Sequence, residues 1–320
     1  MRLHRRGVVL VFGDINIDIL FYVDSLPSDD VSIVAKSMKV MHGGVGGNIA
    51  VALSRLGVKV ELVGAVGTDT FGDEAIKALA QEGVDTRFIE RISKEPTGVM
   101  TILVFPNGSR TIIGYRGANI LANPRTALKS MNTRIAHVHI SGYMALSKDG
   151  EANITTLAKR GKEVGTMVSI DLEGIATEKP ELVHRLKGYV DYVFLNKDEM
   201  TYLIGVSSIE EGIKRIYEIL KPSAVFLKLG SQGSAIITND KVLRIPPFRV
   251  EVVDTTGAGD AFNAGVIYGL MLNLKPEEAA LLGNAMGAYS CMGYGARHLP
   301  RDINELLNKF PTLNKILKTR

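Results

Sequence analysis

Short apolar runs alternate with longer amphipathic segments along most of the 320-residue chain. The apolar runs have the length of buried strands, and the segments between them repeat their apolar residues with helical spacing. Strands that alternate with helices form a largely parallel sheet with helices on both faces. The chain is therefore predicted to be an α/β protein. The expected strands are 8–12, 60–63, 101–105, 138–140, 167–170, 192–195, 224–229 and 234–238, and the expected helices include 48–56, 73–82, 209–220 and 276–289.

Two stretches, 17–42 and 96–118, interrupt this alternation with turn residues and little helical periodicity. Asn107-Gly108 lies between two apolar runs of the second stretch, which is typical of a β-hairpin. We expect the two stretches to pair into a small second sheet, a lid over the edge where ligands bind in open α/β folds. The large α/β domain is then predicted to comprise residues 1–16, 43–95 and 119–320.

The composition narrows the class of protein. Hydrophobic residues make up 46% and charged residues 22%, which predicts a substantial core. One cysteine, Cys291, excludes an internal disulfide and suits a reducing compartment. The first apolar run, 8–12, is too short for a signal peptide or a membrane span, so we expect a cytoplasmic protein without a membrane partner. The net charge of +4 is spread along the chain, which disfavours a nucleic-acid partner.

The segment 254–260 carries the strongest indication of chemistry, and it reads Asp-Thr-Thr-Gly-Ala-Gly-Asp. It follows an apolar run, 250–253, and opens a helical pattern. Gly257 and Gly259 allow a tight turn and close approach by a ligand, and the first turn of the helix offers free N–H groups and a positive dipole end to a phosphate. Asp260 falls in that turn, where it either lies beside the phosphate or simply stabilises the dipole. The dipole is expected to hold the pKa of Asp260 low.

Other polar residues follow the expected strands. Asn16 and Asp18 lie two apart, so in extended chain they point to one side and suit a polyol, although they could also cap a turn. Asn48 suits substrate binding, helix capping, or both. Asn196 and Glu199 lie three apart, so on a helical turn they could reach a hydrated Mg²⁺; the alternative is an ordinary surface helix.

Several other chemistries are disfavoured. Ile49 stands where a dinucleotide-binding fingerprint needs its third glycine, and the chain has no P-loop motif, so a dehydrogenase or P-loop enzyme is not expected. His137 and His139 lack metal-ligand company and are interpreted as structural. Cys291 has no evident activating partner and is expected to be packed.

These segments together, with Gly43–Ala50, Lys228–Gly233 and Ser290–Pro300, resemble in order the motifs of the ribokinase-like family of carbohydrate kinases, also called the PfkB family. The resemblance implies a three-layer α/β/α fold and an ATP-dependent kinase that phosphorylates a hydroxyl of a sugar-like molecule. It implies that Asp260 is the catalytic base and that the N–H groups of Gly257, Ala258 and Gly259 form an anion hole. It also implies ATP and Mg²⁺, and a homodimer formed through the lid. A non-catalytic sugar or nucleotide sensor is the alternative outside the enzymes.

The resemblance assigns a role to each matching residue. The expected substrate contacts are Asp14, Asn16, Asp18, Gly43, Gly44, Asn48, Tyr115, Arg116 and Asp260. The expected nucleotide contacts are Asn196, Lys228, Gly230, Gly233, Thr256, Gly257, Gly259 and Asn284. Mg²⁺ is expected at Glu199 and Asn196, through water. A monovalent cation such as K⁺ is a candidate ligand of Asp254, Thr256, Ser290, Gly293 and Gly295.

The acceptor stays open among several classes. The pair Tyr115-Arg116 resembles 2-keto-3-deoxygluconate kinases, whereas the turn 13–18 looks more like ribokinases or nucleoside kinases. Ribokinases carry Lys where this chain has Val45, which counts against ribose itself. The candidates are a neutral sugar or polyol, a nucleoside, and a sugar acid or phosphate that pairs with Arg116.

Overall fold

The computed structural model describes residues 7–106, 109–206, 208–238 and 241–317. Within them, one sheet of nine strands has the order β13-β12-β11-β10-β9-β8-β1-β4-β5. The strands from β11 to β5 run parallel, and β12 is antiparallel to both of its neighbours. The strand bounds are β1 Val8–Phe12, β4 Lys59–Gly67, β5 Asp85–Ile92, β8 Ile135–Ser141, β9 Met167–Asp171, β10 Tyr192–Asn196, β11 Ala224–Lys228, β12 Ser234–Thr238 and β13 Lys241–Ile245.

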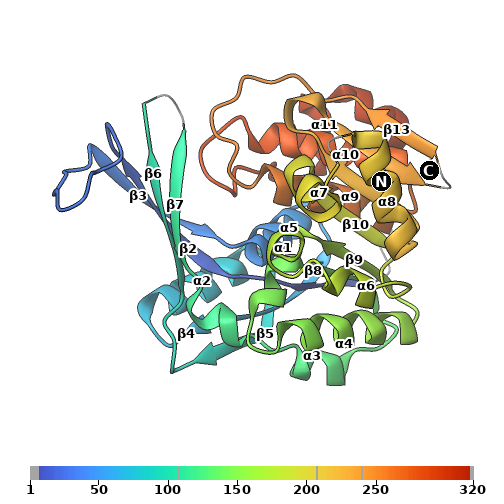
Figure 1. Cartoon of the computed structure of the whole chain (residues 1–320), viewed down its shortest axis with the longest axis horizontal. Coiled ribbons are helices and arrows are strands. Elements are labelled where there is room, and N and C mark those ends of the chain that lie inside the picture. The colour runs from blue at the N-terminus through green and yellow to red at the C-terminus, as the bar shows by residue number, and fades with distance from the viewer. Residues whose placement is uncertain (1–6, 107–108, 207, 239–240, 318–320) are drawn as a thin grey trace.

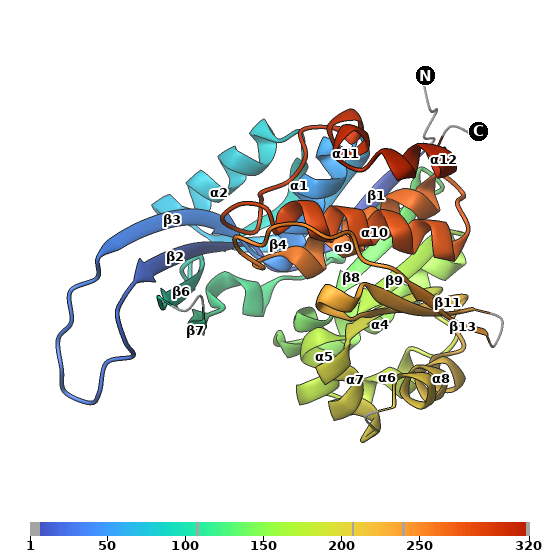
Figure 2. The same ribbon diagram turned by 90° about the horizontal axis from the view of Figure 1, so that it is seen from above.

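Helices cover both faces of this sheet, as Figure 2 shows. One face carries α1 Val45–Arg55, α2 Thr70–Gln81, α9 Ala258–Met271, α10 Pro276–Ser290, α11 Ile303–Lys309 and α12 Asn314–Leu317. The other carries α3 Arg125–Ser130, α4 Gly150–Glu163, α5 Glu173–Glu178, α6 Leu182–Arg185, α7 Lys197–Ile204 and α8 Ile209–Leu220. None of the described helices is long and apolar enough to cross a membrane.

The two cores follow from the alternation of side chains along each strand. Val9 and Val11 of β1 point into the core beneath α1 and α9, while Leu10 and Phe12 point into the core beneath α4 and α8. All four are at most 1% exposed, so β1 is buried on both faces. This explains why its sequence is a continuous apolar run rather than an alternating one.

A second sheet of four strands, β3-β2-β6-β7, projects from the α/β body (Figures 1 and 2). Its strands are β2 Asn16–Tyr22, β3 Ser37–Gly43, β6 Gly98–Val104 and β7 Arg110–Tyr115. β2 and β6 run parallel, and the two outer pairs are antiparallel. The two sequence stretches thus pair with each other as expected, and β6 and β7 form the predicted hairpin. The Asn107-Gly108 turn itself lies outside the described residues.

Some elements differ from the sequence prediction. β5 and β13 were not expected, because both are edge strands whose charged residues mask the period of two. α4 was also missed. α1 begins three residues earlier than expected, because glycines obscure its first turn.

Candidate active site

Helix α9 begins at the glycine-rich turn. Gly257 precedes its first turn with a φ of 75°, a left-handed conformation that glycine adopts without strain. A Cβ atom at Gly257 would lie 2.6 Å from Cα of Ala296, so the close approach of that loop also requires glycine. The N–H groups of Gly257 and Gly259 have no partner among the described residues, whereas that of Ala258 donates to the Thr255 carbonyl at 3.3 Å. The tip therefore offers two free donors to an anion.

Asp260 lies in the first turn of α9, as predicted. Nδ2 of Asn48 donates a 2.8 Å hydrogen bond to Oδ2 of Asp260. Asn48 lies inside the first turn of α1, whose N-cap is Gly44, so of the two roles considered for it, helix capping is wrong. The early start of α1 turns the amide toward α9 instead, and the amino-terminal ends of two helices meet at one carboxylate.

The Asp260 carboxylate is less hydrated than its position at a helix tip suggests. Burial raises the pKa of Asp260 to about 7. The hydrogen bond from Asn48 and the charge of Lys228 lower it, but by less. Asp171 and Asp18 add to the rise. The prediction of a low pKa is wrong, because the reduced hydration of the half-buried carboxylate outweighs the favourable contacts.

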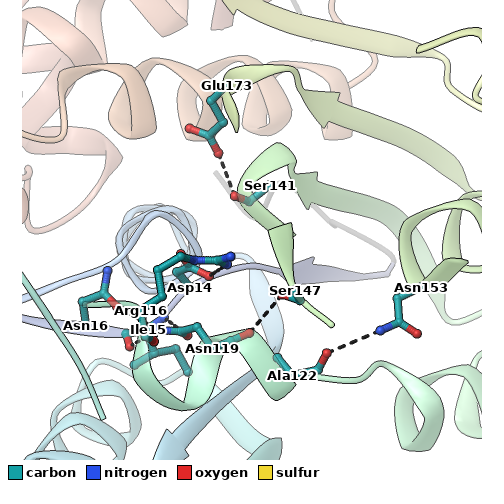
Figure 3. A network of polar contacts seen from close by, with 10 residues as sticks. All are labelled: Asp14, Ile15, Asn16, Arg116, Asn119, Ala122, Ser141, Ser147, Asn153 and Glu173. Atoms are coloured by element: carbon teal, nitrogen blue, oxygen red, sulfur yellow. Dashed lines mark hydrogen bonds and ion pairs between the residues drawn. The ribbon is translucent and has the colours of Figure 1, made fainter. Parts of the chain in front are cut away.

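The turn after β1 and the start of β2 hold three buried polar side chains, Asp14, Asn16 and Asp18, each at most 8% exposed. Asp14 accepts from Nη2 of Arg116 at 2.7 Å and from its Nε at 3.2 Å (Figure 3). Asn119 fixes the turn, because its amide bonds both backbone groups of Ile15 and donates to Oδ1 of Asn16 at 2.8 Å.

Asp18 points toward the start of α1. A Cβ atom at Gly43 would lie 2.3 Å from both carboxylate oxygens of Asp18, so this glycine makes room for the carboxylate. Arg297 lies on the same side: its Nη2 donates to the Gly43 carbonyl at 3.3 Å and its Nε to Oδ1 of Asn48 at 3.2 Å. Burial raises the pKa of Asp18 to about 6, and the charge of Arg297 opposes this rise.

Lys228, at the end of β11, brings a cation to the tip of α9. A Cβ atom at Gly259 would lie 3.7 Å from Nζ of Lys228. The ammonium pairs with Oδ2 of Asp171 at 2.5 Å, and Asn263 donates to the same oxygen at 2.6 Å. Burial alone would raise the pKa of Asp171, but Lys228 and Asn263 hold it below its ordinary value. Oδ1 of Asp171 is buried and has no partner among the described residues.

Two further carboxylates surround this ion pair. Burial and the charge of Asp171 raise the pKa of Glu173 well above its ordinary value, and Glu173 accepts from Ser141 at 2.7 Å (Figure 3). Burial, again with Asp171, raises the pKa of Glu199 to about 7. Asn196 and Glu199 are brought together, but as the capping box of α7: Asn196 is the N-cap, and its amide donates to Glu199 at 2.6 Å.

A cavity of about 550 Å³ adjoins the tip of α9. Its walls are mainly apolar, with Phe248, Val250 and Phe262 among them. Nδ2 of Asn284 donates to the carbonyls of Ile245 and Pro246, which orients the amide. The predicted nucleotide residues on its lining are Lys228, Gly230, Gly233, Gly259 and Asn284. Cys291 also lines it, and burial raises the pKa of this thiol.

The candidate residues for a monovalent cation are only partly assembled. Oδ1 of Asp254 accepts from the N–H of Thr256 at 2.9 Å and from its hydroxyl at 2.7 Å, and Oδ2 accepts from the N–H of Gly295 at 2.9 Å. Ser290 instead donates to the Gly287 carbonyl of its own helix at 2.9 Å. Gly293 packs against His298, where a Cβ atom would lie 2.3 Å from the ring.

Other predicted residues lie away from the cluster. Tyr115 is 55% exposed on the face of the small sheet opposite Asp18, and its hydroxyl donates to Glu95 at 2.7 Å. His137 and His139 are fully buried on β8, where both rings bond the Ser169 hydroxyl, at 2.7 and 2.9 Å. Burial lowers the pKa of both rings, which fits their structural interpretation.

Sequence reasoning missed several side chains of the cluster. Asp171 and Glu173 follow the end of a predicted strand, the edge where ligands bind in parallel sheets, so this signal was available. Arg297 and Asn263 carried no comparable signal. A single arginine after a loop, or an asparagine inside a helix, has many surface equivalents.

The chain is similar to a family of known proteins over nearly its whole length. The model of the pfkB family carbohydrate kinases matches residues 7–303. The chain is 29% identical to a ribokinase of Haemophilus influenzae, over 91% of this chain and 94% of that protein. It is 30% identical to an ATP-dependent ribose-1-phosphate kinase of Halopiger xanaduensis, over the same shares of the two chains. The structure of Arabidopsis thaliana ribokinase complexed with ribose and ATP superposes with a TM-score of 0.83 at 26% identity, covering 94% of this chain and 98% of that one.

These matches span both sheets and the whole site, and they confirm the predicted ribokinase-like fold. Members of this family use ATP and Mg²⁺. The chain belongs to the pfkB family of carbohydrate kinases and is a phosphotransferase that acts on a sugar hydroxyl.

Proposed function

We propose that the protein transfers the γ-phosphoryl group of ATP to a hydroxyl of a small sugar-like substrate, with Asp260 as general base. The observation that carries this proposal is the Asp260 carboxylate in the first turn of α9, beside the free N–H groups of its tip, bonded to Asn48 and near enough to Asp18 for that charge to raise its pKa. In the proposed complex the hydroxyl is held at the turn of Asp14, Asn16 and Asp18, and the phosphate at the tip of α9.

The pKa of Asp260 suits proton abstraction near neutral pH. A carboxylate with a pKa of about 7 is a stronger base than an exposed one. In a loose phosphoryl-transfer transition state the proton leaves late, so the base mainly orients the hydroxyl. The N–H groups of Gly257 and Gly259, together with Lys228, stabilise the charge that develops on the phosphoryl oxygens.

The residues around Lys228 fit Mg²⁺ and a nucleotide. Oδ1 of Asp171 has no partner among the described residues, and Glu199 lies near enough to Lys228 for its charge to act on the ammonium. No group of three or more acidic, His or Cys side chains among the described residues could enclose a metal. Mg²⁺ keeps several waters and needs one or two carboxylates, so this donor set suits it, and the ion would neutralise phosphate charge. The apolar cavity beside Gly259 has the size for an adenine and its ribose.

We propose a pentose or a pentose derivative as the acceptor. Two of the relatives described above act, by name, on ribose or ribose 1-phosphate. A second candidate is an anionic sugar, a phosphate or an acid. Arg297 favours it, because burial lowers the pKa of this guanidinium to about 10 and its hydrogen bonds go to uncharged oxygens of Gly43 and Asn48. Arg116 is paired with Asp14 and has less charge to offer.

The test is ADP formation across a panel of ribose, deoxyribose, ribose 1-phosphate, nucleosides, polyols and sugar acids. We expect turnover with a pentose compound and a loss of about 10²–10⁴-fold in kcat for Asp260→Asn. Turnover of the variant near the wild-type rate would refute the role of Asp260, and a wild-type protein that turns over no member of the panel would refute the acceptor class. ADP as donor in place of ATP is tested with the same panel by measuring AMP formation.

We also propose that the small sheet is a lid and that it mediates a homodimer. Its face opposite Asp18 exposes apolar side chains that a partner would cover, namely Met38, Val40, Ile113 and Tyr115. Patches of this kind mark interaction surfaces in soluble proteins.

Closure of the lid over the sugar would exclude water and restrain ATP hydrolysis. Use of ATP favours a cytoplasmic enzyme.

A further inference from the structure

Arg110 links the small sheet to the phosphate-binding turn. It is the first residue of β7, and its guanidinium reaches the segment that leads into α9. Nη1 lies 3.1 Å from Oδ1 of Asp254 and also bonds the Thr256 hydroxyl, while Nη2 lies 3.0 Å from the Thr255 hydroxyl. One side chain of the small sheet therefore binds three consecutive residues, which end immediately before Gly257.

This contact is partly shielded from water. The Arg110 side chain is 28% exposed and that of Asp254 12%, so their attraction is stronger than that of a fully exposed pair. Arginine stays protonated at all relevant pH values, and its planar fork can meet several oxygens at once. Burial alone would raise the pKa of Asp254. Hydrogen bonds from Thr256 and Gly295, together with the charge of Arg110, instead hold it below its ordinary value.

The same residues do not fit the monovalent cation that the family resemblance implies. Both carboxylate oxygens of Asp254 accept hydrogen bonds from N–H or hydroxyl donors, and Oδ1 faces the guanidinium. The Thr256 hydroxyl oxygen accepts from Arg110 as well. A cation that used these oxygens would lie against a permanent positive charge, which repels it. Ser290 donates within its own helix, although its oxygen keeps accepting capacity.

We propose that the Arg110 guanidinium takes the place of the monovalent cation, neutralising Asp254 and fixing the 254–256 segment from the small sheet. The tip of α9 is then held in its anion-binding form only when β7 lies against it, and the protein needs no K⁺. This inference rests on the proposed function for its meaning in catalysis. The contact itself does not depend on which sugar is bound.

The experiment compares the wild type with Arg110→Ala and Arg110→Lys in KCl and in tetramethylammonium chloride at equal ionic strength. Two readouts are measured: the thermal midpoint Tm, and the affinity for the Mg²⁺ complex of a non-hydrolysable ATP analogue by calorimetry. Arg91→Gln is the matched control, because it removes another arginine–carboxylate contact, with Asp73 at 2.6 Å, on the distant strand β5.

We expect wild type and Arg91→Gln to have the same Tm and affinity in both salts. In tetramethylammonium, Arg110→Ala is expected to bind the analogue about tenfold more weakly, the loss of one charge-assisted contact. K⁺ is expected to restore most of that affinity and to raise the Tm of this variant alone. Arg110→Lys keeps the charge but loses the fork, so an intermediate affinity without a K⁺ response is expected.

Two results would overturn the inference: a wild type that already needs K⁺ for its Tm or affinity, or an Arg110→Ala variant that loses nothing and ignores K⁺. The Tm measurement involves no nucleotide or sugar. It therefore tests Arg110 even if the panel assay refutes the kinase assignment.

Discussion

The Asn48 amide donates to the Asp260 carboxylate at 2.8 Å, and its carbonyl oxygen accepts from Arg297 at 3.2 Å. The contact with Arg297 decides which way the Asn48 amide is turned. Because the guanidinium has only donors, it fixes the amide oxygen toward itself and the amide nitrogen toward Asp260. A chain of two hydrogen bonds thus connects a loop arginine to the proposed base.

Asn48→Ala is expected to raise the pKa of Asp260 further. The lost hydrogen bond favours the ionised form, whereas burial, which favours the neutral form, remains. The acidic limb of kcat/KM against pH should move upward by about one unit, so the loss of activity should be large at pH 6 and small at pH 9. An equal loss at both pH values would indicate that Asn48 only binds substrate.

Arg297→Gln and Arg297→Leu distinguish two roles of Arg297: orienting the Asn48 amide and binding an anionic acceptor by its charge. Glutamine can still donate to the Asn48 oxygen, so the pH profile of Arg297→Gln should lie closer to wild type than that of Arg297→Leu. If the acceptor is anionic, both variants should instead raise KM for it in parallel. The pH limb of kcat distinguishes the two roles, since it reports the enzyme with substrate already bound.

Asp260→Asn should stabilise the protein at alkaline pH. The folded-state pKa of about 7 lies above the ordinary value of 3.8, so the folded state binds the proton more tightly than the unfolded state does. The contribution of this group to stability is therefore fully present below pH 3.8, and it is lost as pH rises from there through the folded-state pKa of about 7. Thermal unfolding should give the variant a higher Tm than wild type at pH 8 and a similar Tm at pH 4. A variant that is less stable at pH 8 contradicts the burial of this carboxylate.

The Lys228–Asp171 pair should show strong coupling in stability. Asp171 is 1% exposed, so Asp171→Ala leaves a buried ammonium without its partner and should cost about 3 kcal/mol in the free energy of unfolding. Lys228→Met added to that variant removes the orphaned charge and should recover part of the loss. Urea unfolding of the two single variants and the double variant measures the coupling. Additive losses would mean that the pair contributes little.

The chemistry-bearing turn could be predicted from the sequence because its determinants are local. Two glycines and an aspartate within four residues specify a helix tip with a carboxylate in its first turn, and both the α9 start and Asp260 lie where expected. The alternation of Asn16 and Asp18 likewise predicted their common face of β2. Both inferences depend on near neighbours in the chain.

The partners of Arg297 and Arg110 could not be predicted in this way. Asn48 and Arg297 are 249 residues apart, and Arg110 and Asp254 are 144 residues apart. Such contacts arise only when the order of strands and the position of the small sheet are known. The predicted direction of the Asp260 pKa was wrong for the same reason. A helix dipole can be inferred from the sequence, whereas burial by distant segments cannot.

Ile113→Lys tests the proposed dimer through the lid. Ile113 is 63% exposed on β7, so a lysine there should cost the monomer little, but inside an interface it buries an unpaired charge. Sedimentation analysis should show a dimer for wild type and a monomer for the variant at micromolar concentration, with unchanged far-UV circular dichroism. Lys94→Glu, an exposed charge change in the 93–97 connection that leads into β6, is the control and should remain dimeric. A wild type that sediments as a monomer at all concentrations would show that the apolar face has another partner or none.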